Sequence, residues 1–248
     1  MISNLTVLKK MLIIGILALF AFVAIGTIFL FNEKNILISE KKSKLVNIVE
    51  LPYSLVESEY KAFTDGKIDE KTAKENAVNA IKKLRYDKTN YIWINDDTLP
   101  HPKMIMHPIA TSLDGKVLNA EKFNCATDLE YANNEIVKTD GKKNLFQSFV
   151  EVVNKGNTGF VGYLWPKPKA DGTNTEELYE KLSYVKKFDK WGWVIGSGIY
   201  IDDVNAEFNQ SLLNIILTVF FVLIVLGLVS YFIVKDIDSD SKLNFYKS

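Results

Sequence analysis

Residues with reactive or metal-binding side chains are scarce in this chain of 248 residues. It has one cysteine, Cys125, and only two histidines, His101 and His107, so a disulfide within the chain is excluded. With so few thiolate and imidazole ligands, we expect no zinc site, no other metal and no cofactor. The 30 basic and 30 acidic side chains give a net charge of zero. No excess of positive charge favours a nucleic acid as partner.

Sequence motifs of catalysis are missing as well. The chain contains no glycine-rich phosphate loop, no Walker lysine and no Gly-x-Ser-x-Gly elbow. No cysteine and histidine are accompanied by the third group that an activated nucleophile needs. We therefore expect a binding protein and not an enzyme.

Charge is absent from two long apolar segments, Met11–Phe31 and Leu212–Val234. A helix rises ~1.5 Å per residue, so roughly 20 apolar residues cross the ~30 Å hydrocarbon core of a bilayer. The first segment is longer than the apolar part of a signal peptide, and no small-residue cleavage site follows it. Both segments are therefore predicted to be transmembrane helices.

The two predicted spans divide the chain into five parts. Lys9 and Lys10 precede the first span and Lys235 follows the second, which favours cytoplasmic ends. Lysines after the first span oppose this orientation, but a long domain is translocated largely regardless of its charge. In the plasma membrane, the predicted parts are a cytoplasmic N-terminus (1–10), the first span (11–31), an extracytoplasmic domain (32–211), the second span (212–234) and a cytoplasmic tail (235–248).

Apolar periodicity predicts helices at the start of the extracytoplasmic domain. A long helix is expected over Asn35–Phe63, with a kink or break near Leu51 because Pro52 follows. A turn at 64–67 and a second helix, Glu70–Leu84, come next, and Asp69 is a suitable cap for its first turn.

Alternating aromatic and β-branched residues then predict strands, so the domain is expected to be α+β with an antiparallel sheet. A third helix is marked by the apolar residues between Leu145 and Val153. Segment 111–140 reads as a loop, with a short helix possible over Asp128–Val137, and Pro166–Tyr179 reads as a long turn. The predicted strands are Tyr91–Ile94, Met104–His107, Thr158–Trp165, Lys181–Phe188 and Trp193–Ile201, and Asp202 and Asp203 suit the start of a helix that continues into the second span.

Four blocks of this domain resemble the single Cache domain, type 2. They are Tyr91–Asp96 with Met104–Pro108, Gly159–Pro168, Lys181–Lys186 and Trp191–Tyr200. The resemblance implies a PAS-like sheet that binds a ligand outside the cytoplasm in bacterial chemoreceptors, histidine kinases or diguanylate cyclases. It also implies small organic acids such as acetate, propionate, lactate or pyruvate as ligands.

The length after the second span bears on the expected output. Only residues 235–248 follow it, too few for a signalling domain, so we expect the sensory part of a longer receptor. The leading hypothesis is a methyl-accepting chemotaxis receptor, and the alternatives are a histidine kinase, a diguanylate cyclase or a stand-alone Cache membrane protein. Cytoplasmic signalling partners are expected only if an output domain exists. The helix Asn35–Phe63 offers a seam for a homodimer.

A carboxylate that leaves water needs a cationic partner and neutral donors. Arg85 is the only arginine and its planar fork suits a carboxylate, although it can equally interact with a helix C-terminus. His107 can donate to the ligand or cap a turn. Lys186 shares one strand face with Leu182 and Tyr184, while Ser183, Val185 and Lys187 share the other face, and it can face ligand or solvent.

Aromatic side chains at four strand positions are the remaining candidates for the ligand site. Tyr91 and Trp93 share one strand face, and so do Tyr163 and Trp165. Such side chains can line a pocket and supply an O–H or N–H donor, or they can form ordinary core. The predicted ligand-binding set is Arg85, Tyr91, Trp93, His107, Tyr163, Trp165, Tyr184 and Lys186.

Overall fold

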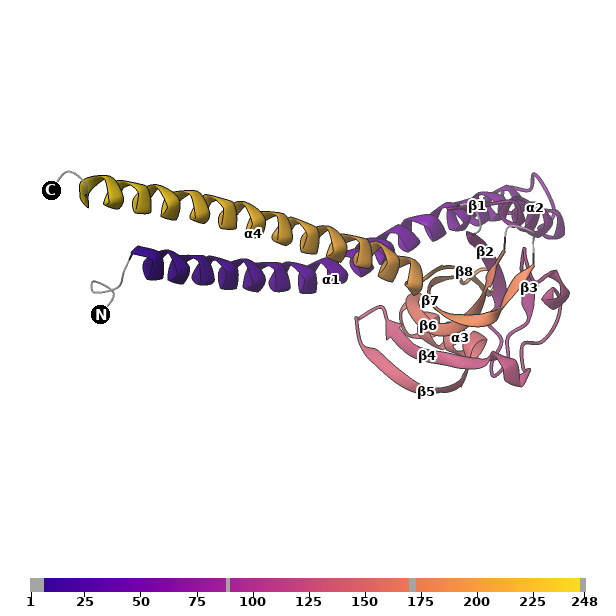
Figure 1. Ribbon diagram of the computed structural model, residues 1–248. Coiled ribbons are helices and arrows are strands. Elements are labelled where there is room, and N and C mark those ends of the chain that lie inside the picture. The colour runs from indigo at the N-terminus through magenta and orange to yellow at the C-terminus, as the bar shows by residue number, and fades with distance from the viewer. Residues whose placement is uncertain (1–6, 88–89, 170–172, 246–248) are drawn as a thin grey trace. The chain divides into compact units, whose positions relative to one another are not determined.

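The computed structural model describes residues 7–87, 90–169 and 173–245, in which two compact units form (Figure 1). One unit, Ile38–Val204, contains the sheet and is called the sheet domain below. The other consists of Met1–Leu37 and Asn205–Ser248, which carry the two apolar runs. The first six and last three residues of the predicted cytoplasmic ends lie outside the described residues.

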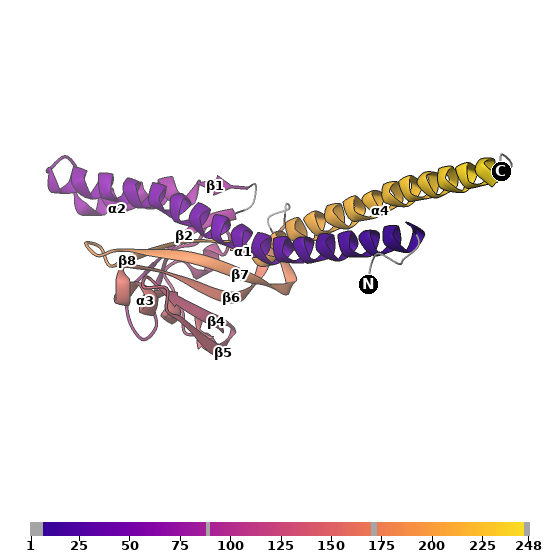
Figure 2. The ribbon, with the colours of Figure 1, turned by 90° about the vertical axis from the view of Figure 1, so that its left-hand side faces the viewer.

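Helix α1 (Val7–Thr64) enters the sheet domain and covers one face of the sheet together with α2 (Figure 2). Its fully buried residues there are Leu45, Val49 and Val56. The predicted break at Pro52 is wrong, because the helix continues to Thr64. Proline removes only one backbone hydrogen bond, and the residues buried on either side of it hold the helix against the sheet.

Helix α2 (Glu70–Lys82) begins where the sequence predicts and follows a turn in which Gly66 has a φ of 73°. The predicted cap is confirmed, since the Asp69 carboxylate accepts a hydrogen bond from the Thr72 backbone N–H at 2.7 Å. The helix buries Ala73, Ala77 and Ile81, whose spacing of four residues puts them on one face.

The described strands form one eight-stranded antiparallel sheet with the order β1-β2-β8-β7-β6-β4-β5, and β3 also pairs with β2. This agrees with the predicted α+β fold. The strands are β1 (Arg85–Tyr86), β2 (Asn90–Asp96), β3 (Met104–Met106), β4 (Asn124–Tyr131), β5 (Ile136–Asn144), β6 (Thr158–Pro168), β7 (Asn174–Phe188) and β8 (Trp193–Tyr200).

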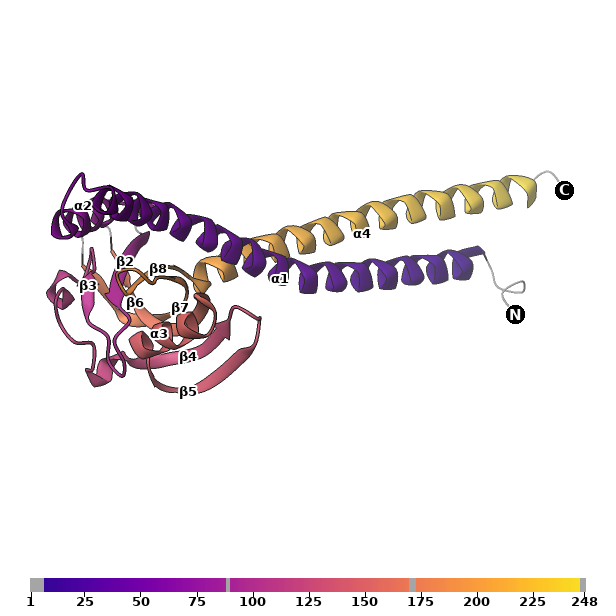
Figure 3. The same ribbon diagram turned by 180° about the vertical axis from the view of Figure 1, so that it is seen from behind.

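Helix α3 (Leu145–Gly156) covers the other face of the sheet, where it packs on β4 and β6 (Figure 3). Asn144 caps it by accepting a hydrogen bond from the Gln147 N–H at 3.0 Å. Phe149 and Val152 are almost completely buried, and the Phe149 ring centroid lies 5.1 Å from that of Trp93. The main core of the domain therefore lies between α3 and the sheet.

Strand β4 and the first part of β5 lie in the segment 111–140 that the sequence predicts to be loop, and the helix considered over Asp128–Val137 is wrong. Two short 3-10 turns, η2 (Thr111–Leu113) and η3 (Glu121–Phe123), precede them. Bulges in β4 interrupt the simple alternation of buried and exposed residues that identifies a strand. β5 is an edge strand that exposes charged side chains, which protect an edge from pairing.

The predicted long turn at Pro166–Tyr179 is also wrong, because β6 and β7 extend into it as a hairpin. Their pairing runs from Thr158↔Lys186 to Pro168↔Asn174. The pairing of β6 with β4 ends at Tyr163, so the prolines lie where β6 has only one neighbour. A residue without a backbone N–H is tolerated at such an edge.

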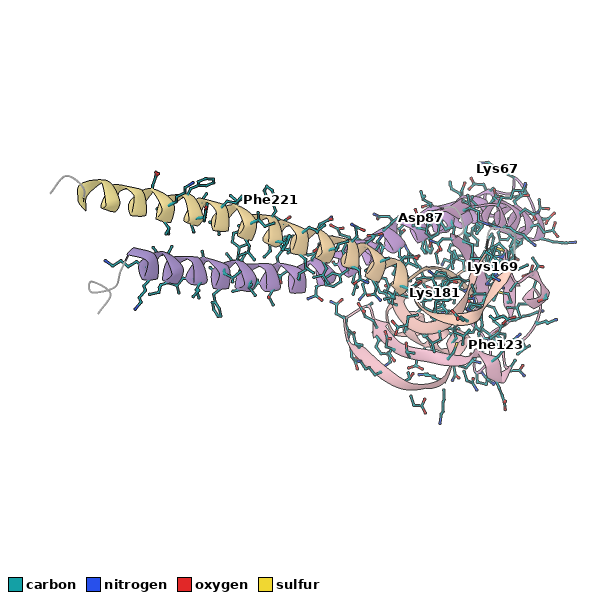
Figure 4. All side chains as sticks on the ribbon, in the orientation of Figure 1. Lys67, Asp87, Phe123, Lys169, Lys181 and Phe221 are labelled. Atoms are coloured by element: carbon teal, nitrogen blue, oxygen red, sulfur yellow. The ribbon has the colours of Figure 1, made fainter. Side chains whose placement is uncertain are left out.

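Helix α4 (Ile201–Phe245) begins directly after β8 with Asp202 and Asp203 in its first turn, as predicted. Both α1 and α4 contain a stretch that is long and apolar enough to cross a membrane. Large apolar side chains in these stretches are exposed, for example Phe20 at 75% and Phe221 (labelled in Figure 4) at 66%. Two candidate membrane-spanning helices thus flank the sheet domain, and their exposed apolar surface fits a lipid environment.

Candidate ligand-binding site

Strand β7 presents one lysine to each face of the sheet. Lys181, Ser183 and Val185 face α3, whereas Leu182, Tyr184 and Lys186 face α1, because successive side chains of a strand alternate. The two sets match the two faces that the sequence predicts. The lysine of the predicted set, Lys186, lies on the α1 face, but the buried polar cluster lies on the face of Lys181.

The Lys181 ammonium group is the charged group of this cluster, and Figure 4 labels the residue on the sheet domain. Its side chain is only 2% exposed, and no acidic side chain in the described part of the chain pairs with it. Nζ donates to the Tyr91 hydroxyl at 3.3 Å and lies 4.4 Å and 4.7 Å from the ring centroids of Tyr91 and Tyr200. Burial lowers the pKa of Lys181 to about 7. The cluster therefore contains a buried lysine that has no acidic partner in the described residues.

His107 supplies a neutral hydrogen-bond donor next to this cation. Its Nδ1 accepts from the backbone N–H groups of Ile109 at 3.3 Å and Ala110 at 2.8 Å, so the proton of the neutral ring is on Nε2. Burial, with smaller effects of Lys181 and Arg85, lowers the pKa of His107 to about 3. The ring centroid lies 4.8 Å from that of Tyr91. His107 thus caps a turn with one nitrogen and keeps an N–H donor on the other.

Two glycines of β8 leave the space that Lys181 and Trp93 occupy. A Cβ on Gly198 would lie 2.1 Å from Ser183 Oγ and 3.0 Å from Lys181 Cε, and a Cβ on Gly196 would lie 2.3 Å from the Trp93 ring. Glycine inside a strand is unfavourable on its own and indicates that another group approaches closely. This pair is the signal in the sequence that could have identified Lys181.

Four of the predicted aromatic residues share the face of Lys181. Tyr163 is buried and its hydroxyl lies 2.8 Å from Ser183 Oγ. Trp165 lies 5.9 Å from the Tyr163 ring and within hydrogen-bonding reach of the Tyr91 hydroxyl. Trp93 donates its N–H to Asn95 at 3.1 Å, so its role here is packing. Together with His107, these aromatic side chains line the cluster that contains the Lys181 ammonium group.

The other three predicted residues are not brought into this cluster. Arg85 is exposed and donates to the carbonyl oxygens of residues 82 and 84 at the end of α2, at 2.8 and 2.7 Å. Lys186 forms an ion pair with Glu50 of α1 at 2.7 Å and lies over the Tyr53 ring. Tyr184 packs on Phe160 on the same α1 face. The structure instead adds Lys181 and Tyr200, which the sequence reasoning missed.

A buried cation among aromatic rings and neutral donors is a site for a small anion with an apolar part. The family model described as a Cache domain matches residues 23–221. The chain therefore belongs to the Cache family, and its single sheet in the described residues carries the blocks that resemble the type 2 domain.

The chain is similar to parts of two curated signalling proteins. It is 31% identical over 211 residues to the methyl-accepting chemotaxis protein McpP of Pseudomonas putida, covering 85% of this chain and 34% of the relative. It is 27% identical to the sensor histidine kinase MctS of Rhizobium johnstonii, covering 71% of this chain and 32% of the relative. The chain thus spans about a third of the length of these relatives.

Two solved structures match the sheet domain over nearly their whole length. One is described as a periplasmic sensor domain of a chemotaxis protein, with 35% identity, a TM-score of 0.53 and coverage of 66% of this chain and 97% of that structure. The other is described as the structural basis for carboxylic acid recognition by a Cache chemosensory domain, with 29% identity, a TM-score of 0.54 and coverage of 67% and 97%. The domain is homologous to the sensor domains of chemoreceptors and sensor kinases.

Proposed function

We propose that the sheet domain binds a small monocarboxylate, such as acetate, propionate, lactate or pyruvate, outside the cytoplasm and acts as a sensor without catalytic activity. The ligand carboxylate would pair with Lys181 on the α3 face, with Tyr91 and His107 as neutral donors. The observation that carries the proposal is the burial of Lys181 without an acidic partner in the described residues.

The energetics of the Lys181 ammonium group favour an anionic ligand. A buried charge without a counter-ion is costly, and a buried ion pair is favourable only when the geometry and the surrounding hydrogen bonds are good. The cluster offers an ammonium group, the Tyr91 hydroxyl and the His107 N–H. The tyrosine and tryptophan rings near them are largely apolar, which favours a short chain with one carboxylate as the ligand. The carboxylic acid recognised by the similar Cache domain supports the same class.

We infer that the binding signal crosses the plasma membrane through α4, because this helix begins directly after β8 and continues into the second apolar run. The output favoured by the first relative is that of a methyl-accepting chemotaxis receptor, which would act as a homodimer with cytoplasmic signalling partners. A histidine kinase is the alternative favoured by the second relative. A diguanylate cyclase or a stand-alone binding protein is compatible with the same sensor domain.

Isothermal titration calorimetry on the full chain in lipid nanodiscs tests this function. Acetate, propionate, lactate and pyruvate are titrated, with uncharged amides and amino acids as competitors. At least one monocarboxylate should bind, and Lys181→Met should weaken it by at least about 30-fold, the lower limit for truncating a buried charge pair. Lys186→Met is the matched control in the same strand and should change the affinity less than threefold. Binding of amino acids only, or equal affinity of the Lys181→Met protein, would contradict the proposal.

A further inference from the structure

Tyr200 lies between the proposed ligand site and the start of α4. It is the last residue of β8, and Ile201 begins the helix. Two ammonium groups contact its ring, that of Lys181 at 4.7 Å and that of Lys167 at 5.0 Å from the centroid. Its hydroxyl donates to the Pro166 carbonyl oxygen at 2.8 Å, directly before Lys167 in β6. One aromatic side chain therefore contacts both the buried cation and the strand that carries the second cation.

Lys167 of β6 forms ion pairs with the first turn of α4. Its Nζ lies 2.6 Å from Asp202 Oδ2 and 2.9 Å from Asp203 Oδ1. Burial lowers the pKa of Lys167, but the hydrogen bonds to the two carboxylates outweigh this effect and the pKa is raised. The other oxygen of Asp202, Oδ1, is buried and has no hydrogen-bond partner in the described residues. Without Lys167, this carboxylate would keep no cationic partner in the described structure.

Helix α1 is attached to the sheet domain by separate contacts. Lys42 pairs with Glu130 of β4 at 2.5 Å, and Glu50 pairs with Lys186 of β7 at 2.7 Å. Both pairs lie on the α1 face of the sheet, and neither shares a contact with Lys181 or Tyr200. In the part of the chain that the structure describes, a change at the buried cation thus has a direct contact path to the start of α4 and none of this kind to α1.

We propose that Lys167 is a positioning residue that couples the state of the Lys181 site to the first turn of α4 through the shared contact with Tyr200. Pairing of Lys181 with a carboxylate withdraws its charge from the Tyr200 ring, since a cation that gains an anionic partner interacts less with an aromatic face. The Tyr200 ring and the Pro166–Lys167 segment then change position, and Asp202 and Asp203 of α4 move with Lys167. This inference extends the proposed function, but it needs only the charge on Lys181 and not a particular ligand.

Hydrogen–deuterium exchange on the full chain in nanodiscs tests the coupling without added ligand. Four proteins are compared, the wild type, Lys181→Met, Lys167→Met and the double variant, with the exchange of residues 201–206 as readout. Lys181→Met should change the exchange rate of this segment by at least about threefold in the wild-type background, the lower end for a cation–aromatic contact. In the Lys167→Met background the same change should be less than 1.5-fold.

Matched variants distinguish coupling from general loosening. Lys186→Met removes another strand lysine that pairs with a helix glutamate, and it should leave the effect of Lys181→Met unchanged. Replacing a buried, unpaired lysine by methionine is not expected to prevent folding, and Lys181→Gln provides a second neutral side chain. An equal effect of Lys181→Met with and without Lys167, or no effect in either background, would overturn the coupling. Propionate calorimetry on the same proteins reports separately on the proposed ligand.

Discussion

Binding of propionate should weaken as the pH rises above about 7, because the Lys181 ammonium group must be charged to pair with the carboxylate. Burial lowers the pKa of Lys181 to about 7 in the free protein. An anion at 3 Å favours the charged form and raises this pKa in the complex. At pH values between the pKa of Lys181 in the free protein and its pKa in the complex, the protein takes up close to one proton for each ligand that binds. The dissociation constant should then rise by up to ~10-fold per pH unit above pH 7, or roughly 50-fold from pH 7 to 9.

Other groups around the ammonium keep their charge over this range. Burial lowers the pKa of His107 to about 3, so its ring stays neutral. Burial also raises the pKa values of Tyr91, Tyr163 and Tyr200, which remain protonated. The ligand itself becomes protonated only at about pH 5, so affinity should be highest between about pH 6 and 7.

Calorimetry in buffers of different ionisation enthalpy measures both quantities, the dissociation constant and the number of protons taken up. At pH 8 about 0.9 proton should be taken up per bound propionate. Lys186→Met should retain this dependence and Lys181→Met should lose it. A dissociation constant that changes less than threefold between pH 6 and 9, without proton uptake, would refute the assignment of Lys181 as the counter-ion.

Stability measurements provide four further predictions. Lys181→Met should stabilise the ligand-free protein at pH 6 by up to roughly 5 kcal/mol. This gain should shrink as the pH rises towards 10.5, because in that window the unfolded wild-type chain binds more protons than the folded one. Urea unfolding at several pH values checks this. Gly198→Ala should cost about 1–3 kcal/mol because its Cβ overlaps Ser183, and a thermal midpoint like that of wild type would contradict the packing. Phe149→Ala should cost about 3–5 kcal/mol in urea, whereas a cost below about 1 kcal/mol would place the core elsewhere. Asp69→Ala should cost about 1 kcal/mol, and the neighbouring exposed Lys71→Ala is its control.

Local physical chemistry determined much of this fold from the sequence alone. The two uncharged runs predict helices long and apolar enough to cross a membrane, since roughly 20 apolar residues span its hydrocarbon core. Asp69 marks the start of α2, and the alternation in Tyr91–Ile94 marks β2, because caps and strand periodicity depend on neighbours in the chain. The order of the four family blocks was enough to identify the Cache domain.

Tertiary structure decided which residues form the site. Lys181 and Lys186 lie in one strand five residues apart, so alternation alone requires opposite faces but does not say which face binds ligand. Helix α1 covers one face and gives Lys186 a glutamate, whereas α3 and the β8 glycines enclose Lys181 without one. Whether a lysine has an acidic partner depends on segments that lie far from it in the sequence. Strand β5 was not predicted for the same reason. Its residues are mostly polar and form a strand only because β4 pairs with them.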